Sequence, residues 1–322
     1  MRKEVIFAVL AGAILGLVVA FGVYRANSAL KPATTSQTPE NTPEPKVNVE
    51  LSIVKPVALS VVTSPTLSVS GITLANATLA ISGETKSYIL EADASGAFSQ
   101  SVALEGGLNE IKVFSFDKDG GSREKSVLVI YSSEFSKYLS KPATASESAE
   151  VATDSVRQKV NQKIEAIEKS PTSYVGTITD KTGTTIQIKN LEGEIEQIAV
   201  TEDATDFVKM IDTVKQIEST DLAIGDFVIA MGLRNGNKIL DAKRILVTTA
   251  YKPSARKALM GTIQKDKSTI SLKPSSGALA ELKFGTNWDG PEISELKAED
   301  KVIVIGDLTD STLTISLIAL VK

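Results

Sequence analysis

Hydrophobic and polar residues alternate over much of this chain, in short runs that end at turn residues. The alternation is clear in residues 66–70 and again in residues 78–82, and a period of two is that of a half-buried β-strand. Turn-forming residues separate the runs, at positions 82–83, 94–96, 105–107 and 119–121. About seven such strands fit between residues 51 and 132, which predicts an aligned β-sandwich.

The last 150 or so residues contain an internal repeat. Val175-Gly176-Thr177-Ile178 returns as Met260-Gly261-Thr262-Ile263, and the block around Asp226 returns around Asp300. The first blocks lie 85 residues apart and the second blocks 74, so the first copy holds 11 extra residues, which we place around residues 207–220.

Each copy of the repeat ends in one more predicted strand, at residues 239–247 and 313–321. Five or so short strands in about seventy residues are typical of a small closed barrel. The sequence therefore predicts two barrels in tandem, at residues 172–249 and 256–322.

The chain opens with an unbroken apolar run from Val5 to Tyr24. At about 1.5 Å per residue these twenty residues form a helix of roughly 30 Å, the thickness of a bilayer core. A cleaved signal peptide is the alternative, but its apolar region is usually about 7–15 residues long. Only Asn27 and Ala29 offer a small-x-small cleavage site here. We expect residues 1–25 to be a cytoplasmic tip and a retained transmembrane anchor, with the bulk of the chain extracytoplasmic.

Small residues recur every four positions along this predicted helix, and Gly12 and Gly16 form a GxxxG pair. That spacing lets two membrane helices approach closely, which would make a homodimer. Glycine is also common in membrane helices in general, so both interpretations stay open.

Two polar stretches separate the predicted folded parts. Residues 26–50 are rich in Pro and Thr and lack the apolar surface that folding needs, so they are expected to form a linker. Residues 133–171 form a second linker that contains a spacer helix, roughly residues 147–169, ended by Pro171. Because linkers separate them, the modules are expected to fold independently.

Residues 51–132 resemble the bacterial Ig-like domains of surface glycosidases and adhesins. The resemblance lies in four segments, Val69-Ser70-Gly71, residues 93–98, residues 104–111 and residues 116–121. In such proteins these domains are spacers or adhesion modules.

The two predicted barrels are similar to OB-like envelope domains of unknown function, through a G-x-I strand and an L-x-x-G-D-x-V turn. Glu299 stands where the first copy has Gly225, which predicts a looser turn in the second copy. The fold class expected from the whole chain is mainly β, with an N-terminal transmembrane helix, an Ig-like sandwich and two OB-like barrels.

The amino-acid composition limits the reactions and ligands that this chain can support. The 322 residues are 42% hydrophobic and 23% charged, with a net charge of −4, so a nucleic-acid partner is not expected. There is no cysteine and no histidine. This excludes Ser-His-Asp and Cys-His hydrolases, zinc-thiolate sites and iron–sulfur clusters. The site types that the composition still allows are a carboxylate pair, a Ser/Lys dyad and a cation held by oxygen ligands.

The residues that could supply that chemistry have simpler structural interpretations. Asp117 and Asp119 lack the spacing of an EF-hand and fit a hairpin turn. Asp226 and Asp300 each follow a turn, where a side chain that binds its own backbone is favoured. The pairs Ser136-Lys137 and Ser140-Lys141 stand in a polar linker with no pocket to desolvate the lysine. We assign no catalytic, cofactor or metal-binding residue.

Trp288 is the one ligand-binding candidate. It is the only tryptophan and stands among polar residues in the segment 285–290. A tryptophan there suits stacking on a sugar, and it equally suits capping the end of a small barrel. The sequence thus predicts a non-enzymatic, membrane-anchored envelope protein that acts as a scaffold, adhesion or partner-binding module. The alternative is a protein that binds wall or capsule glycan through the second barrel.

Overall fold

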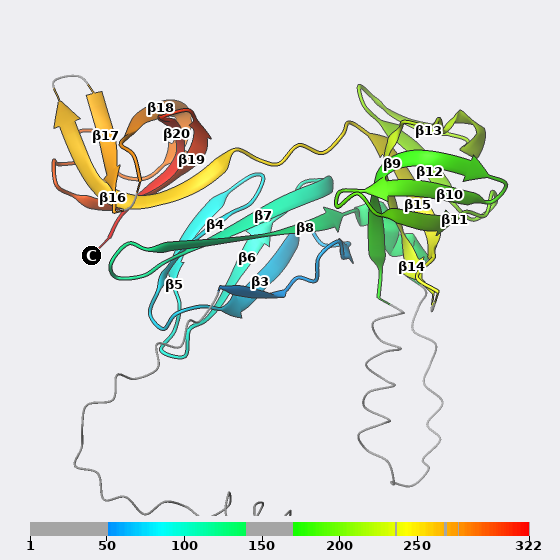
Figure 1. The fold of residues 1–322 in the computed structure, drawn as a ribbon, viewed down its shortest axis with the longest axis horizontal. Coiled ribbons are helices and arrows are strands. Elements are labelled where there is room, and N and C mark those ends of the chain that lie inside the picture. Colours follow the sequence, from blue (N-terminus) through cyan, green and yellow to red (C-terminus); the bar gives the residue numbers. More distant parts are fainter. Residues whose placement is uncertain (1–50, 140–169, 236, 267–268, 276, 322) are drawn as a thin grey trace, which may run out of the picture. The chain divides into compact units, whose positions relative to one another are not determined.

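The structure is a computed structural model, and it describes residues 51–139 and 170–321, apart from 236, 267–268 and 276 (Figure 1). The predicted membrane helix at 5–24, with Gly12 and Gly16, lies outside the described residues. So do the linker at 26–50 and the spacer helix at 147–169. Within the described ranges, no helix is both long enough and apolar enough to span a bilayer.

Residues 52–131 form two mainly antiparallel sheets packed face to face, as the alternation predicted. One sheet has the order β1–β3–β6: β1 (Ser52–Lys55), β3 (Thr66–Ile72) and β6 (Ala97–Ala103). The other has the order β2–β8–β7–β4–β5: β2 (Val61–Val62), β8 (Ser122–Tyr131), β7 (Gly107–Phe116), β4 (Thr78–Ser82) and β5 (Ser87–Glu91). Within this second sheet β2 runs parallel to β8. Inward side chains of both sheets, such as Val69, Ile81, Val102 and Ile111, make the buried core.

The first copy of the repeat forms a five-stranded ring in the order β9–β10–β11–β15–β14. Its strands are β9 (Thr172–Thr182), β10 (Thr185–Asn190), β11 (Ile195–Ala199), β14 (Phe227–Arg234) and β15 (Leu240–Thr248). A short parallel pairing of β11 with β15 closes the ring. Its sheet continues past β15 through β12 (Asp206–Met210) and β13 (Val214–Ile217). A one-turn 3-10 helix, η2 (Ser219–Asp221), follows β13.

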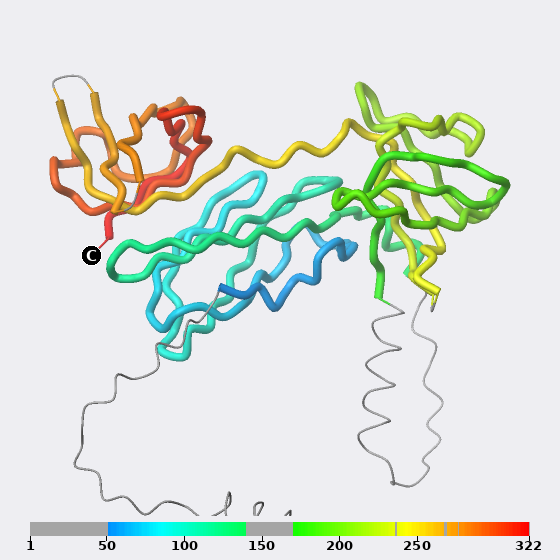
Figure 2. Tube along the Cα trace, in the orientation of Figure 1, coloured from blue at the N-terminus to red at the C-terminus, as the bar shows by residue number. Residues whose placement is uncertain are grey.

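The second copy forms a closed barrel in the order β16–β17–β18–β20–β19. Its strands are β16 (Arg256–Asp266), β17 (Thr269–Pro274), β18 (Ala280–Asp289), β19 (Lys301–Thr309) and β20 (Thr312–Leu320). In both rings the third and fifth strands are parallel, so the two copies have the same topology. Figure 2 traces the first in green to yellow and the second in orange to red.

The β12–β13 hairpin accounts for the extra residues of the first copy, because the second copy has no strands between β18 and β19. Two glycines of the repeat have a shared steric role. A β-carbon at Gly176 would collide with the carbonyl oxygen of Lys189, and one at Gly261 with that of Lys273. The neighbouring strand therefore runs too close for any side chain at this point of either barrel.

The turn before the fourth strand is the same in both copies. The Asp226 carboxylate accepts the Ala223 N–H at 2.9 Å, and the Asp300 carboxylate accepts the Lys297 N–H at 2.7 Å. Gly225 has a φ of +98° and Glu299 a φ of +71°, and each donates its N–H at 2.9 Å to a carbonyl of the neighbouring strand, that of Ile178 or Ile263. The expectation of a looser second turn is therefore wrong: Glu299 adopts the left-handed backbone that Gly225 adopts without a side chain.

The described residues all belong to one compact unit, Val49–Lys322. A 3-10 helix, η1 (Ser133–Tyr138), follows the sandwich, and its Phe135 is buried among outward side chains of the sandwich and the first barrel. A second shared cluster joins the sandwich to the second barrel, with Phe114 and Phe116 of β7 packed against Met260 and Ile303. The outer face of β7 is thereby covered over much of its length.

Candidate functional site

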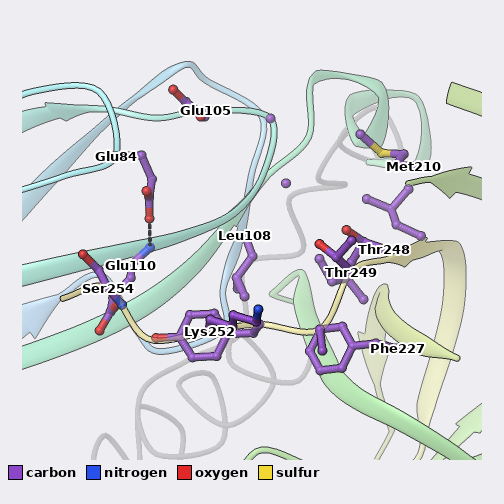
Figure 3. Close-up of a pocket in the computed structure, with 16 residues that line it drawn as sticks. Glu84, Glu105, Leu108, Glu110, Met210, Phe227, Thr248, Thr249, Lys252 and Ser254 are labelled. Atoms are coloured by element: carbon purple, nitrogen blue, oxygen red, sulfur yellow. Dashed lines mark hydrogen bonds between the residues drawn. The ribbon is translucent and has the colours of Figure 1, made fainter. Parts of the chain in front are cut away.

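A cavity of about 520 Å³ lies beside β7, and we call it the junction pocket. The sandwich supplies its lining from β7 and from the loops around Glu84 and Glu105. The first barrel supplies residues of β12, β14 and β15, and the connector between the barrels supplies residues 249–252 and 254 (Figure 3). Pockets of this size at the meeting of modules are common places for ligands.

One wall of the junction pocket is apolar. Side chains alternate along β14: Val228 and Ala230 point into the barrel core, while Phe227 and Ile229 point outward. Met210 of the β12–β13 hairpin, Leu246 of β15 and Leu108 of β7 belong to the same apolar cluster and extend this surface.

The opposite wall is acidic. Glu84, Glu105 and Glu110 all line the pocket, and Lys252 is the one basic residue of its lining. Glu84 and Glu105 are exposed. The Glu84 carboxylate accepts the backbone N–H of Glu110 at 3.0 Å, as the dashed line in Figure 3 marks.

Glu110 is only 8% exposed and belongs to a charged cluster that fastens the connector to β7. It lies 3.7 Å from the ammonium of Lys112, which is itself buried. The Glu110 carboxylate accepts the Ser254 N–H at 2.8 Å, and Lys112 donates to the Ser254 carbonyl at 2.6 Å. Burial, and then the charge of Glu110 beside it, raises the pKa of the Tyr251 hydroxyl, which therefore stays protonated.

Trp288 lies at the end of β18 and is half-buried. Its ring packs edge-on to Phe284 with 5.1 Å between ring centroids, and both rings pack against the core of the second barrel. The same tryptophan lines a polar cleft of about 570 Å³, together with Glu84, Lys86, Arg256, Asn287 and Asp289. Trp288 thus has the contacts of a barrel cap on one side and a polar hollow on the other.

The other residues singled out from the sequence have structural contacts. Asp117 accepts the N–H groups of Asp119 and Gly121 at 3.1 and 2.7 Å within its hairpin. Asp226 and Asp300 cap their turns as described above. The Ser136 hydroxyl donates to the Ser133 carbonyl, so it is not paired with Lys137. Ser140 and Lys141 lie outside the described residues.

Lys137 is instead part of a charged contact between η1 and the first barrel. It donates to Asp206 of β12 at 2.6 Å, and the Tyr138 hydroxyl donates to the same carboxylate oxygen. Arg244 of β15 lies 3.6 Å away. The Lys137 and Tyr138 hydrogen bonds hold the pKa of Asp206 below its usual range, and the bond to Asp206 raises the pKa of Lys137.

Across the described part of the chain, no three acidic side chains converge in a way that could hold a metal ion. Sequence reasoning identified Trp288 but not the junction pocket, because its lining comes from segments that are about a hundred residues or more apart, 84–110 and 210–254. A glutamate and a lysine two positions apart in a strand, as at 110 and 112, give the pattern of a solvated face. No signal in the sequence shows that a connector covers them.

No family model matches the chain, and no curated protein matches it either.

Proposed function

We propose that this chain is a non-enzymatic, membrane-anchored envelope protein whose extracytoplasmic β modules bind a partner. The anchor is the apolar run from Val5 to Tyr24, with the N-terminus in the cytoplasm. The sandwich is Ig-like in its alternation and turn pattern. The strand order of the two barrels, with parallel third and fifth strands, supports an OB-like assignment.

The observation that carries this proposal is the junction pocket. It joins an apolar wall to an acidic wall at the meeting of sandwich, barrel and connector. Two of its carboxylates already have protein partners: Glu110 contacts Lys112 and Ser254, and Glu84 accepts the backbone N–H of Glu110. A cavity whose lining is fixed by such contacts is suited to recognition.

Two measurements test this proposal. Mass spectrometry of the natural protein should find the N-terminal segment retained, and a mature N-terminus near Leu30 would contradict the anchor. Pull-down from envelope fractions with the full chain should recover a saturable partner. Recovery of the same material by a chain whose pocket is blocked by Thr249→Trp, an exposed lining position, would contradict binding at this site.

A second candidate function is glycan binding at the Trp288 cleft. The specific observation is that the tryptophan lines a hollow rich in hydroxyl, amide and charged groups, which suits a sugar. Added wall polysaccharide should then shift the fluorescence of the only tryptophan, and Trp288→Phe should weaken retention on that polysaccharide. Unchanged emission at saturating glycan would leave Trp288 as a barrel cap alone.

A further inference from the structure

We propose that the junction pocket receives a lysine or arginine side chain presented by a protein partner. This inference rests on the proposed function and adds the chemical class of the ligand group. The two walls of the pocket match the two parts of such a side chain, an alkyl stem and a cationic head.

The acidic wall carries charge that the described residues leave uncompensated. Lys112 pairs with Glu110, so that carboxylate is balanced. Within the described ranges, neither Glu84 nor Glu105 forms an ion pair, and both stand at the exposed rim. Two acidic side chains beside a cavity favour a cationic ligand group over an anionic one.

The apolar wall lies opposite those carboxylates, across the cavity. Leu108, Met210 and Phe227 are each half-buried, so part of each side chain stays open to a ligand. Figure 3 shows Glu84 and Glu105 on one side of the hollow and Met210 and Phe227 on the other. A lysine or arginine stem can cover this apolar surface while its head reaches the carboxylates.

Lys252 provides a control in which the expected change in affinity has the opposite sign. It is the one basic residue of the lining, and we expect its charge to oppose the entry of a second cation into the pocket. Removing its charge should therefore strengthen binding of a cationic ligand, the reverse of what removal of a direct contact would do.

The test is isothermal titration of the full chain in nanodiscs with the peptide acetyl-Gly-Ser-Lys-Ser-Gly-amide. Its norleucine analogue has the same stem without the charge, and its glutamate analogue reverses the charge. We expect the lysine peptide to bind at least tenfold more tightly than the norleucine peptide, and the glutamate peptide not to bind. Binding of the lysine peptide should weaken as salt rises.

The variants locate the site. Glu84→Gln with Glu105→Gln should weaken the lysine peptide at least tenfold, while Gln at position 84 can still accept the Glu110 N–H. Lys252→Gln should bind it more tightly. Glu91→Gln, an exposed glutamate of β5 outside the pocket, is the matched control and should leave affinity unchanged. Met210→Ala should weaken the lysine and norleucine peptides alike, and thermal melting of each variant checks its fold.

Equal binding of the lysine and norleucine peptides would overturn this inference. So would equal effects of the double variant and of Glu91→Gln. If an envelope partner is captured through the pocket but Glu84→Gln with Glu105→Gln captures it as well as the natural chain, the ligand class is wrong and the proposed function stands.

Discussion

At the scale of single residues, four connections between strands in the described part of the chain share one five-residue turn. Three of them are hairpins, and the first joins the two sheets of the sandwich. The first residue of the turn is Asp93, Asp117, Asn190 or Asn235, and the side-chain oxygen of that residue accepts the N–H groups two and four positions on. The fourth residue has a positive φ in every case and is glycine in three of the turns. Lys238 holds that place in the remaining turn, with a φ of +60°. The Asp and Gly residues predicted the first two turns. The positive φ of Lys238 could not be predicted, because lysine is not a residue type that favours this conformation.

Glu299 gives a stability prediction at this scale. An L-residue with a side chain loses about 1–2 kcal/mol in the left-handed region, and glycine avoids most of that loss. No hydrogen bond or ion pair of the Glu299 side chain is found in the described part of the chain. Glu299→Gly should therefore raise the free energy of unfolding by about 1 kcal/mol. Gly225→Ala, the matched change in the other copy, should lower it, and chemical denaturation of both variants checks the pair.

At the scale of elements, the inserted β12–β13 hairpin gives the first copy of the repeat its own contact with the sandwich. Counting residues between the repeat blocks located the insertion. Its contacts, however, are made with η1, which begins some seventy positions earlier in the chain. Val208 of the hairpin joins the cluster around Phe135, and Asp206 accepts from Lys137 and Tyr138. Such a partner cannot be inferred from the hairpin's own sequence.

This contact predicts a pH dependence. The folded-state pKa of Asp206 is lowered, so its contribution to stability is present above the ordinary aspartate pKa, near 4, and is lost as pH falls through the folded value. Asp206→Asn should destabilise the chain at pH 7, and its stability should approach that of the natural chain as pH falls through the lowered pKa of Asp206. Thermal melts from pH 7 to pH 2 measure this. A constant difference across the range would contradict the ion pair.

The raised pKa of Lys137 makes the opposite prediction at alkaline pH. Its contribution is complete below the ordinary lysine pKa, near 10.4, and is lost as pH rises through the folded value. Lys137→Met should therefore reduce the loss of stability that the chain shows as pH rises into the alkaline range. At acid pH a loss should remain, because Asp206 still contacts Tyr138 and Arg244. Half of the Lys137 side chain is exposed, so this effect should be small and should shrink with salt.

At the scale of the whole molecule, the β architecture and its repeat were readable from the sequence, and the contacts among modules were not. Strands such as β3 and β6 alternate between buried and exposed side chains, as their sequences predict. Yet β7 buries both faces, because Glu110 and Lys112 are covered by the connector at Ser254. The same limit applies to Trp288: the sequence singled it out as a candidate, but the sandwich residues that share its cleft, such as Glu84 and Lys86, could not be predicted. Independent folding of the modules stays a prediction.

The buried pair on β7 predicts a large cost when one partner is removed. Lys112→Met leaves the Glu110 carboxylate buried without its cation, which typically costs about 3–5 kcal/mol. Adding Glu110→Gln should return part of that loss, because no unpaired charge is then buried. Denaturant unfolding of the two single variants and the double variant gives the coupling. Additive losses would show that the pair does not act as one unit.

We propose above all that the protein binds an envelope partner at the junction pocket. Photo-cross-linking in the intact envelope tests it most directly, with p-benzoylphenylalanine placed at Thr249, an exposed residue of the pocket lining. The control position is Val54, which is 56% exposed on the other sheet of the sandwich. We predict one discrete cross-linked species from position 249 that is absent from position 54. No species from position 249, or the same species from both positions, would contradict the claim.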